Sequence, residues 1–168
     1  GGISNHQGIC IRVEKLHLNE LKEFLNQFKS DYSIIALLDQ LEDSQNVGAI
    51  FRSALAFNLD GIILTQDNSV NENSFLTKAA SSAIDKVSFT KIKNISSCIK
   101  ILKESGYWIY GLEMNAGKSL KEIKFPKKAV IILGSEHKGL RKITTSLCDD
   151  LIKIEISKEL ESLNVSNT

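Results

Sequence analysis

The stretch VIILGSEHKGLRK, residues 130–142, decides how the fold of this chain is predicted. Its apolar, strand-like run ends abruptly at Gly134, and a short polar turn follows. A turn of this kind usually holds a phosphate. A P-loop, however, requires Lys and then Ser or Thr after its second glycine, whereas Gly139 is followed by Leu and Arg. The carboxylate of Glu136 would also repel a triphosphate. The turn therefore has the shape of a nucleotide site with the wrong chemistry for phosphates.

The composition is that of one globular domain. The chain has 168 residues, of which 42% are hydrophobic, and this is enough to bury a full core. Its formal net charge of +1 gives no global basic signature for nucleic acid. If RNA is a partner, local patches or another domain must supply the phosphate contacts. Its 3 cysteines lack the spacing of a metal site, and no apolar run approaches the ~20 residues that span a membrane. We expect a cytoplasmic protein that uses neither a metal nor a membrane.

Strand-like and helix-like segments alternate along the chain. Apolar runs predict strands, and apolar residues at helical spacing predict helices. The expected strands are 33–39, 61–65, 86–91, 107–113, 129–134 and 151–156, and the expected helices are 18–28, 46–58, 74–83, 94–106 and 138–148. Most of these strands are apolar on both faces. The pattern predicts an α/β fold, with a mostly parallel sheet of about six strands and helices on both of its faces.

Polar residues cluster after three of the expected strands, where ligands bind in open parallel sheets. The segments are DSQNVGAIFRSA (43–54), GSEHKGL (134–140) and ESLNVS (161–166). Together, and in this order, they resemble the three motifs of the SpoU, or TrmH-type, family of RNA ribose 2′-O-methyltransferases in the SPOUT superfamily. NHQG (5–8) also resembles the segment before the catalytic domain in the subgroup that methylates a guanosine of large-subunit ribosomal RNA.

The resemblance implies a topology, a cofactor and a set of site residues. It implies a C-terminal trefoil knot, a homodimer, and S-adenosylmethionine as the cofactor. The residues that match cofactor-binding positions of the family are Gly134, Ile154 and Leu163. The residues that match its catalytic positions are Asn46, Arg52, Glu136, Ser162 and Asn164. The absent side chain of Gly134 is expected to let the adenosine approach the backbone.

Each polar site residue also has a purely structural interpretation. Asn46 is a plausible helix cap, and Ser162 and Asn164 could cap a terminal helix. Arg52 could be an ordinary solvated arginine, and Glu136 could favour the N-terminus of the helix that follows it. A group of lysines could form either a solvated face or a patch that follows RNA phosphates. These lysines are Lys118, Lys121, Lys124, Lys127 and Lys128.

The implied reaction is methyl transfer to a ribose 2′-hydroxyl of structured RNA. Because arginine stays protonated in proteins, we predict that Arg52 stabilises the developing alkoxide rather than acting as the base. Glu136 would hold Arg52 or complement the positive sulfonium. A tRNA substrate is an alternative to ribosomal RNA, and so is a non-catalytic, RNA-binding member of the fold. An oxidoreductase is disfavoured, because Gly-x-Gly-x-x-Gly does not follow the first strand.

The resemblance also divides the chain. Residues 1–15 are expected to be a linker from an RNA-binding domain, and residues 16–168 the catalytic domain. The third motif stops short, so we expect a final helix beyond Thr168. For the homodimer, the apolar stripe of helix 46–58 and the terminal motif are the expected interface.

Overall fold

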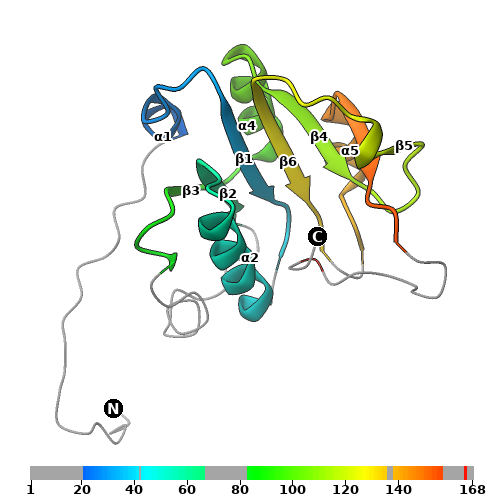
Figure 1. Ribbon diagram of the computed structural model, residues 1–168, viewed down its shortest axis with the longest axis horizontal. Coiled ribbons are helices and arrows are strands. Elements are labelled where there is room, and N and C mark those ends of the chain that lie inside the picture. Colours follow the sequence, from blue (N-terminus) through cyan, green and yellow to red (C-terminus); the bar gives the residue numbers. More distant parts are fainter. Residues whose placement is uncertain (1–20, 42, 67–82, 136–137, 157–164, 166–168) are drawn as a thin grey trace, which may run out of the picture.

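The core of the protein is a parallel sheet. The computed structural model of the chain describes residues 21–41, 43–66, 83–135, 138–156 and Val165. Within these residues a seven-stranded sheet has the order β3-β2-β1-β6-β4-β7-β5, and all its paired neighbours run parallel. The strands are β1 (Ser33–Leu38), β2 (Gly61–Thr65), β3 (Phe89–Ile92), β4 (Trp108–Leu112), β5 (Lys118–Ser119), β6 (Lys128–Leu133) and β7 (Asp150–Lys153). Figure 1 shows β1 and β6 side by side in the middle of the sheet.

The α/β class and the parallel sheet predicted from the sequence are confirmed. The described sheet has one strand more than expected. The additional strand is β5, which was not predicted because it has only 2 residues. A strand this short carries no apolar periodicity that a sequence pattern can reveal. Its existence depends on pairing with β7, in the register Lys118↔Ile152 and Ser119↔Lys153.

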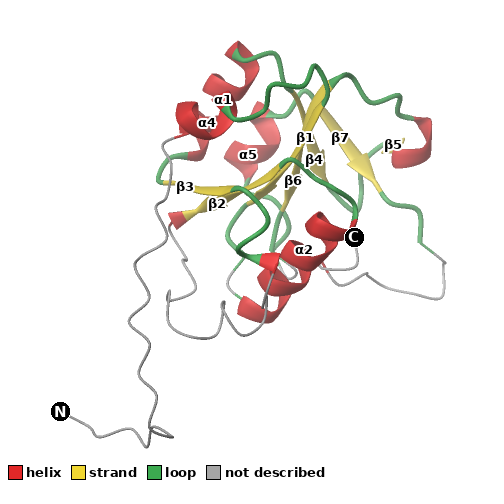
Figure 2. Ribbon diagram, turned by 60° about the vertical axis from the view of Figure 1, so that its left-hand side comes forward, coloured by secondary structure: helices red, strands yellow, loops and turns green. Residues whose placement is uncertain are grey.

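Helices cover both faces of the sheet (Figure 2). The helices α1 (Leu21–Asn26), α4 (Ile95–Glu104) and α5 (Lys142–Leu147) pack on one face, and α2 (Ser44–Ala56) packs on the other. Successive residues of β1 point to opposite faces, so that Ile35 and Leu37 join the first cluster while Ala36 and Leu38 join the second. This arrangement explains why the strands are apolar at consecutive positions.

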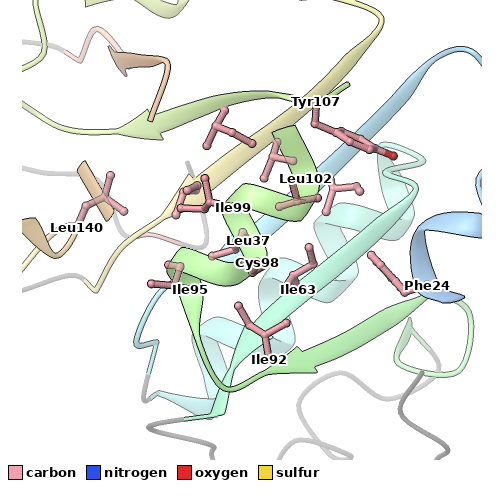
Figure 3. Close-up of a cluster of buried hydrophobic side chains, with 14 residues drawn as sticks. Phe24, Leu37, Ile63, Ile92, Ile95, Cys98, Ile99, Leu102, Tyr107 and Leu140 are labelled. Atoms are coloured by element: carbon pink, nitrogen blue, oxygen red, sulfur yellow. The ribbon is translucent and has the colours of Figure 1, made fainter. Parts of the chain in front are cut away.

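The first of these clusters holds α4 against the sheet (Figure 3). Ile99 and Leu102 of α4 are almost fully buried, at 1% and 0% exposed, and Phe24 of α1 is also at 0%. Full burial of a side chain of this size contributes about 1.5–3 kcal/mol. The tight fit extends to Gly61, where a Cβ would lie 2.5 Å from the ring of Phe24. Each of these contacts fixes a helix relative to the strand beneath it.

Local signals set both ends of α4. The Asn94 side chain accepts a hydrogen bond from the backbone N–H of Ser97 at 2.9 Å, and thereby caps the first turn. Gly106 follows the helix with a φ of +84°, a left-handed conformation that favours glycine. The predicted cap and glycine stop are confirmed.

The start of α2 differs from the prediction. The helix begins at Ser44, and Asp43 caps it by accepting a hydrogen bond from the Gln45 N–H at 2.8 Å. The interpretation of Asn46 as the cap is wrong, because a capping residue must precede the helix whereas Asn46 lies inside its first turn. Asn46 is buried there, at 7% exposed.

The start of α5 is also later than predicted. The helix begins at Lys142 rather than near residue 138. Gly139 has a φ of +64°, which a right-handed helix cannot contain. The alternative in which a helix begins close behind Glu136 is therefore wrong, although Glu136 itself lies outside the described residues.

Several predictions fall outside the described residues. These are the linker 1–15, most of helix 74–83, and the part of the expected knot that includes 157–164. They stay predictions. Within the described ranges, no helix combines the length and the apolar character that crossing a membrane requires.

Candidate functional site

The candidate site lies at one edge of the sheet. Because β1, β6, β4 and β7 are neighbours and run parallel, the turns that follow them emerge at the same edge. Gly134 directly follows β6, and Ile154 directly follows β7. Asn46 lies in the first turn of α2, which begins after the turn from β1. The topology thus places at one edge of the sheet three residues that are far apart in sequence.

The turn after β6 closes on itself at Gly134. A Cβ at Gly134 would lie 2.3 Å from the carbonyl carbon of Gly139 and 2.6 Å from the nitrogen of Leu140. These are backbone atoms that cannot swing away. The sequence predicted that the glycine leaves open space for an adenosine. In the structure, the backbone of the turn itself occupies the space that a Cβ of residue 134 would take. Gly134 makes the fold of the turn possible.

Short hydrogen bonds hold this turn in shape. The Gly139 N–H donates to the Ser135 carbonyl at 2.8 Å, and the two residues form a β-bridge. The Lys138 N–H donates to Oγ of Ser135 at 3.2 Å. The positive φ of Gly139 lets the chain reverse at this point. The described residues on the two sides of this turn, 134–135 and 138–140, are therefore held close together.

An ion pair with a buried carboxylate lies where β1 leaves the sheet, and no sequence pattern predicted it. The carboxylate of Asp39, the residue after β1, is fully buried, and its Oδ1 lies 2.7 Å from an Nη atom of Arg141. The Thr144 hydroxyl donates to the other oxygen of Asp39 at 2.6 Å. The only available signal was a carboxylate at the end of an apolar strand, and that signal does not reveal its partners.

Glu113 was also missed. It follows β4, and its backbone N–H donates to the Ile152 carbonyl at 3.0 Å. A Cβ placed on Gly139 would lie 3.7 Å from a carboxylate oxygen of Glu113. This half-buried carboxylate therefore faces the compact turn after β6. Nothing in the surrounding sequence, GLEMNAG, distinguishes it from an ordinary loop residue.

Arg52 lies farther along α2. Its side chain is exposed, and it makes no hydrogen bond or ion pair with another residue of the described ranges. Its charge is therefore accessible to a partner that approaches α2 from outside.

The remaining predicted site residues lie outside the described residues. They are Glu136, Ser162, Leu163 and Asn164. One neighbour of theirs is described, however. Val165 is buried, at 9% exposed, and belongs to the hydrophobic cluster that packs α2 on the sheet. Val165 therefore lies on the face of the sheet that α2 covers.

The apolar stripe of α2 does not provide the expected dimer interface. Its members Val47, Ile50, Phe51 and Ala54 are at most 5% exposed and pack against the sheet within the same chain. An amphipathic helix on a sheet uses its apolar face for the core. The prediction that this stripe pairs two subunits is wrong for that reason.

The lysine group is largely engaged in ion pairs. Lys118 pairs with Asp150, and Lys121 pairs with Glu155 at 3.1 Å. Lys127 lies 3.5 Å from Asp31. Lysines whose charges are paired in this way are more consistent with a solvated face than with a phosphate-binding patch.

The two described thiols are not candidates for covalent catalysis. Burial raises the pKa of Cys98 from its ordinary value of 9.0 to about 12, and that of Cys148 to about 11. A nucleophilic cysteine requires the opposite shift, because the thiolate is the reactive form. Both side chains therefore remain neutral at physiological pH and serve packing.

Comparison with known proteins identifies the family. Residues 33–168 match the SpoU rRNA Methylase family. The chain is 34% identical over 169 residues to the 23S rRNA (guanosine-2'-O-)-methyltransferase RlmB of Xanthomonas axonopodis pv. citri, with 99% of this chain and 68% of the relative covered. It is 36% identical over 171 residues to an uncharacterized tRNA/rRNA methyltransferase of Borreliella burgdorferi, with 96% of this chain and 75% of that protein covered.

A solved structure shares the fold. The AdoMet-bound rRNA methyltransferase from Sinorhizobium meliloti superposes with a TM-score of 0.78 at 20% sequence identity. The superposition covers 90% of this chain and 57% of that chain. The three sequence segments, the parallel sheet and the family match all agree, and the chain belongs to the SpoU rRNA methylase family.

Proposed function

We propose that this chain is the catalytic domain of an enzyme that methylates the ribose 2′-hydroxyl of a guanosine in large-subunit ribosomal RNA. The observation that carries the proposal is the 34% identity, over 99% of the chain, to a 23S rRNA (guanosine-2'-O-)-methyltransferase. The edge of the sheet supports it, since three turns converge where parallel sheets bind ligands.

The residues at this edge fit S-adenosylmethionine. Leu112 and Ile154 are half-buried and offer apolar surface to an adenine. The carboxylate of Glu113 can accept hydrogen bonds from ribose hydroxyls, or it can stabilise a positive sulfonium. The backbone of the turn 134–140 would line the other side, and Leu163 is assigned to the same site by its motif position. When bound, the cofactor supplies a methyl group that is already activated, so the proposed chemistry calls for no metal.

The proposed task of the polar side chains is to orient and charge-stabilise the attacking ribose. Arg52 is exposed, and its planar guanidinium suits an alkoxide or a neighbouring phosphate. Asn46 would orient the segment at the start of α2. Glu136, Ser162 and Asn164 complete the proposed set through their motif positions. A phosphate oxygen or a water would accept the proton of the 2′-hydroxyl.

The proposal includes RNA as the partner, a second copy of the chain as the dimer partner, and the cytoplasm as the location. Exposed cations on both copies would then share the RNA contacts. Light scattering of the full chain should give twice the monomer mass. A strictly monomeric protein with full methylation activity would contradict the dimer.

The decisive experiment is to map ribose methylation in RNA from cells that lack the protein. We expect one guanosine of the large-subunit RNA to lose its 2′-O-methyl group, and the purified protein with S-adenosylmethionine to restore it. Loss of a methyl group from tRNA instead would replace the substrate in the proposal. Unchanged methylation in both RNAs, together with no methyl transfer in vitro, would indicate a non-catalytic member of the family.

A further inference from the structure

Asp39 stands at the junction of the two segments that carry the proposed site. Its backbone N–H donates to the Leu133 carbonyl at 2.8 Å, directly before Gly134. Its side chain reaches Arg141 at the end of the turn and Thr144 in α5. Asp39 thus contacts the end of β6 through Leu133, the residue before α5 through Arg141, and α5 itself through Thr144.

The same residue begins the connection to α2. Gln40 follows with a φ of +58°, a conformation that is uncommon for a residue with a side chain. The Gln40 N–H donates to Oγ1 of Thr65 at 3.1 Å, and this hydrogen bond ties the connection to the end of β2. Asp39 and Gln40, the first residues of this connection, are therefore held on one side by β2 and on the other by the partners of Asp39.

The burial of Asp39 is costly by itself. Its side chain is 0% exposed, and a buried carboxylate is tolerated only when it is paired and hydrogen-bonded. A buried ion pair typically stabilises a fold no better than apolar side chains of similar volume. What the pairing does provide is direction, because the Thr144 hydroxyl must point at one oxygen of Asp39 while the Arg141 guanidinium lies beside the other.

We propose that Asp39 is a positioning residue, which fixes the described residues of the turn after β6, 134–135 and 138–140, relative to the start of α2 through Arg141 and Thr144. The proposal rests on the proposed function, since that turn lines the cofactor site and α2 carries Asn46 and Arg52. When a substitution removes the charge of Asp39, the ion pair to Arg141 is lost and the turn shifts away from the geometry that binds the cofactor. Asp39 itself touches neither cofactor nor RNA in this arrangement.

The test compares two isosteric substitutions with a matched control. Asp39→Asn removes the charge, and Thr144→Val removes one hydrogen bond to it. The control is Asp149→Asn, which breaks an ion pair of the same 2.7 Å length, to Lys103, at the opposite edge of the sheet. Each full-length variant is examined at a temperature at which circular dichroism shows it to be folded.

Two readouts separate positioning from stability. The first is the Kd for S-adenosylmethionine, which we expect Asp39→Asn to raise roughly 3- to 30-fold and Thr144→Val to raise less. The second is hydrogen exchange without cofactor, where both variants should accelerate exchange of the Gly139 N–H, which donates to Ser135 in the wild type. The control should leave both quantities unchanged. The combined variant Asp39→Asn/Thr144→Val should raise Kd by less than the product of the single effects, because both act on one network.

The outcomes are distinguishable. Lower melting temperatures with unchanged Kd and unchanged exchange at Gly139 would show that the network is only structural, and would overturn the inference. If Asp39→Asn does not fold, Thr144→Val decides by the same criteria. If the wild type itself does not bind S-adenosylmethionine, the proposed function fails, whereas the exchange at Gly139 still reports on whether Asp39 holds the turn.

Discussion

Gly134 and Gly139 pack backbone to backbone, so closely that a Cβ on the first would lie 2.3 Å from the carbonyl carbon of the second. The turn after β6 therefore tolerates no side chain at its first position. The contact links a single sequence position to the shape of the proposed cofactor site.

Substitution Gly134→Ala should lower both stability and cofactor affinity. Forcing one methyl group into a packed site typically costs about 1–3 kcal/mol, and here the opposing atoms are backbone. Calorimetry should show that S-adenosylmethionine binding is lost or strongly weakened, while neither ATP nor NAD binds tightly to the wild type. Gly117→Ala is the matched control, because a Cβ there would meet nothing within 4 Å. Wild-type affinity in Gly134→Ala would contradict the proposed role of the turn.

Substitution Arg52→Ala should reduce the methylation rate and leave cofactor affinity nearly unchanged. Loss of one electrostatic contact to a transition state typically costs roughly 100- to 1,000-fold in rate. Arg52→Lys should recover little, because an ammonium lacks the planar fork of arginine. Single-turnover methylation and calorimetry measure the two effects separately. Lys100→Ala, an exposed cation of α4, serves as the control and should keep the wild-type rate. Normal turnover in Arg52→Ala would remove Arg52 from the proposed site.

The internal role of the α2 stripe can be tested with two phenylalanines. Phe51 is 0% exposed and its ring meets that of Phe89 edge to face, at 5.5 Å between centroids. Phe51→Ala should therefore lower the free energy of unfolding by about 3–5 kcal/mol, as for other buried aromatic truncations. Phe57, which follows the same helix, is 78% exposed, and Phe57→Ala should change little. Urea denaturation measures both. Equal effects would mean that the stripe is not a core face.

Stability should fall at high pH because of Cys98. Burial raises its pKa from 9.0 to about 12, so between these values the folded chain keeps a proton that the unfolded chain has released. The stabilising contribution is full below the unfolded pKa and is lost as the pH rises towards the folded one. Urea denaturation between pH 8 and pH 11 should give a steeper decline for the wild type than for Cys98→Ala. Other titrating groups are common to both proteins, so parallel curves would contradict the burial of this thiol.

Much of the architecture can be predicted from local sequence. The β1 segment SIIALL is apolar at consecutive positions, which is sufficient to indicate a strand buried on both faces. Asn94 and Gly106 delimit α4 because capping and left-handed backbone depend on single residues. The order of strands and helices, and the three segments that resemble family motifs, could be found for the same reason. Each is a property of neighbouring residues.

The tertiary structure decided what depends on distant parts of the chain. Asp39 and Thr144 are separated by 105 positions, and no sequence pattern announces their hydrogen bond. The N-cap of α2 is Asp43 rather than Asn46 because the path of the chain out of β1 selects which side chain faces the free N–H groups. The apolar stripe of α2 is a core face rather than a dimer interface because the sheet covers it. Local residues determine which elements form, whereas long-range packing determines where they begin, what they cover, and which side chains meet at the edge of the sheet.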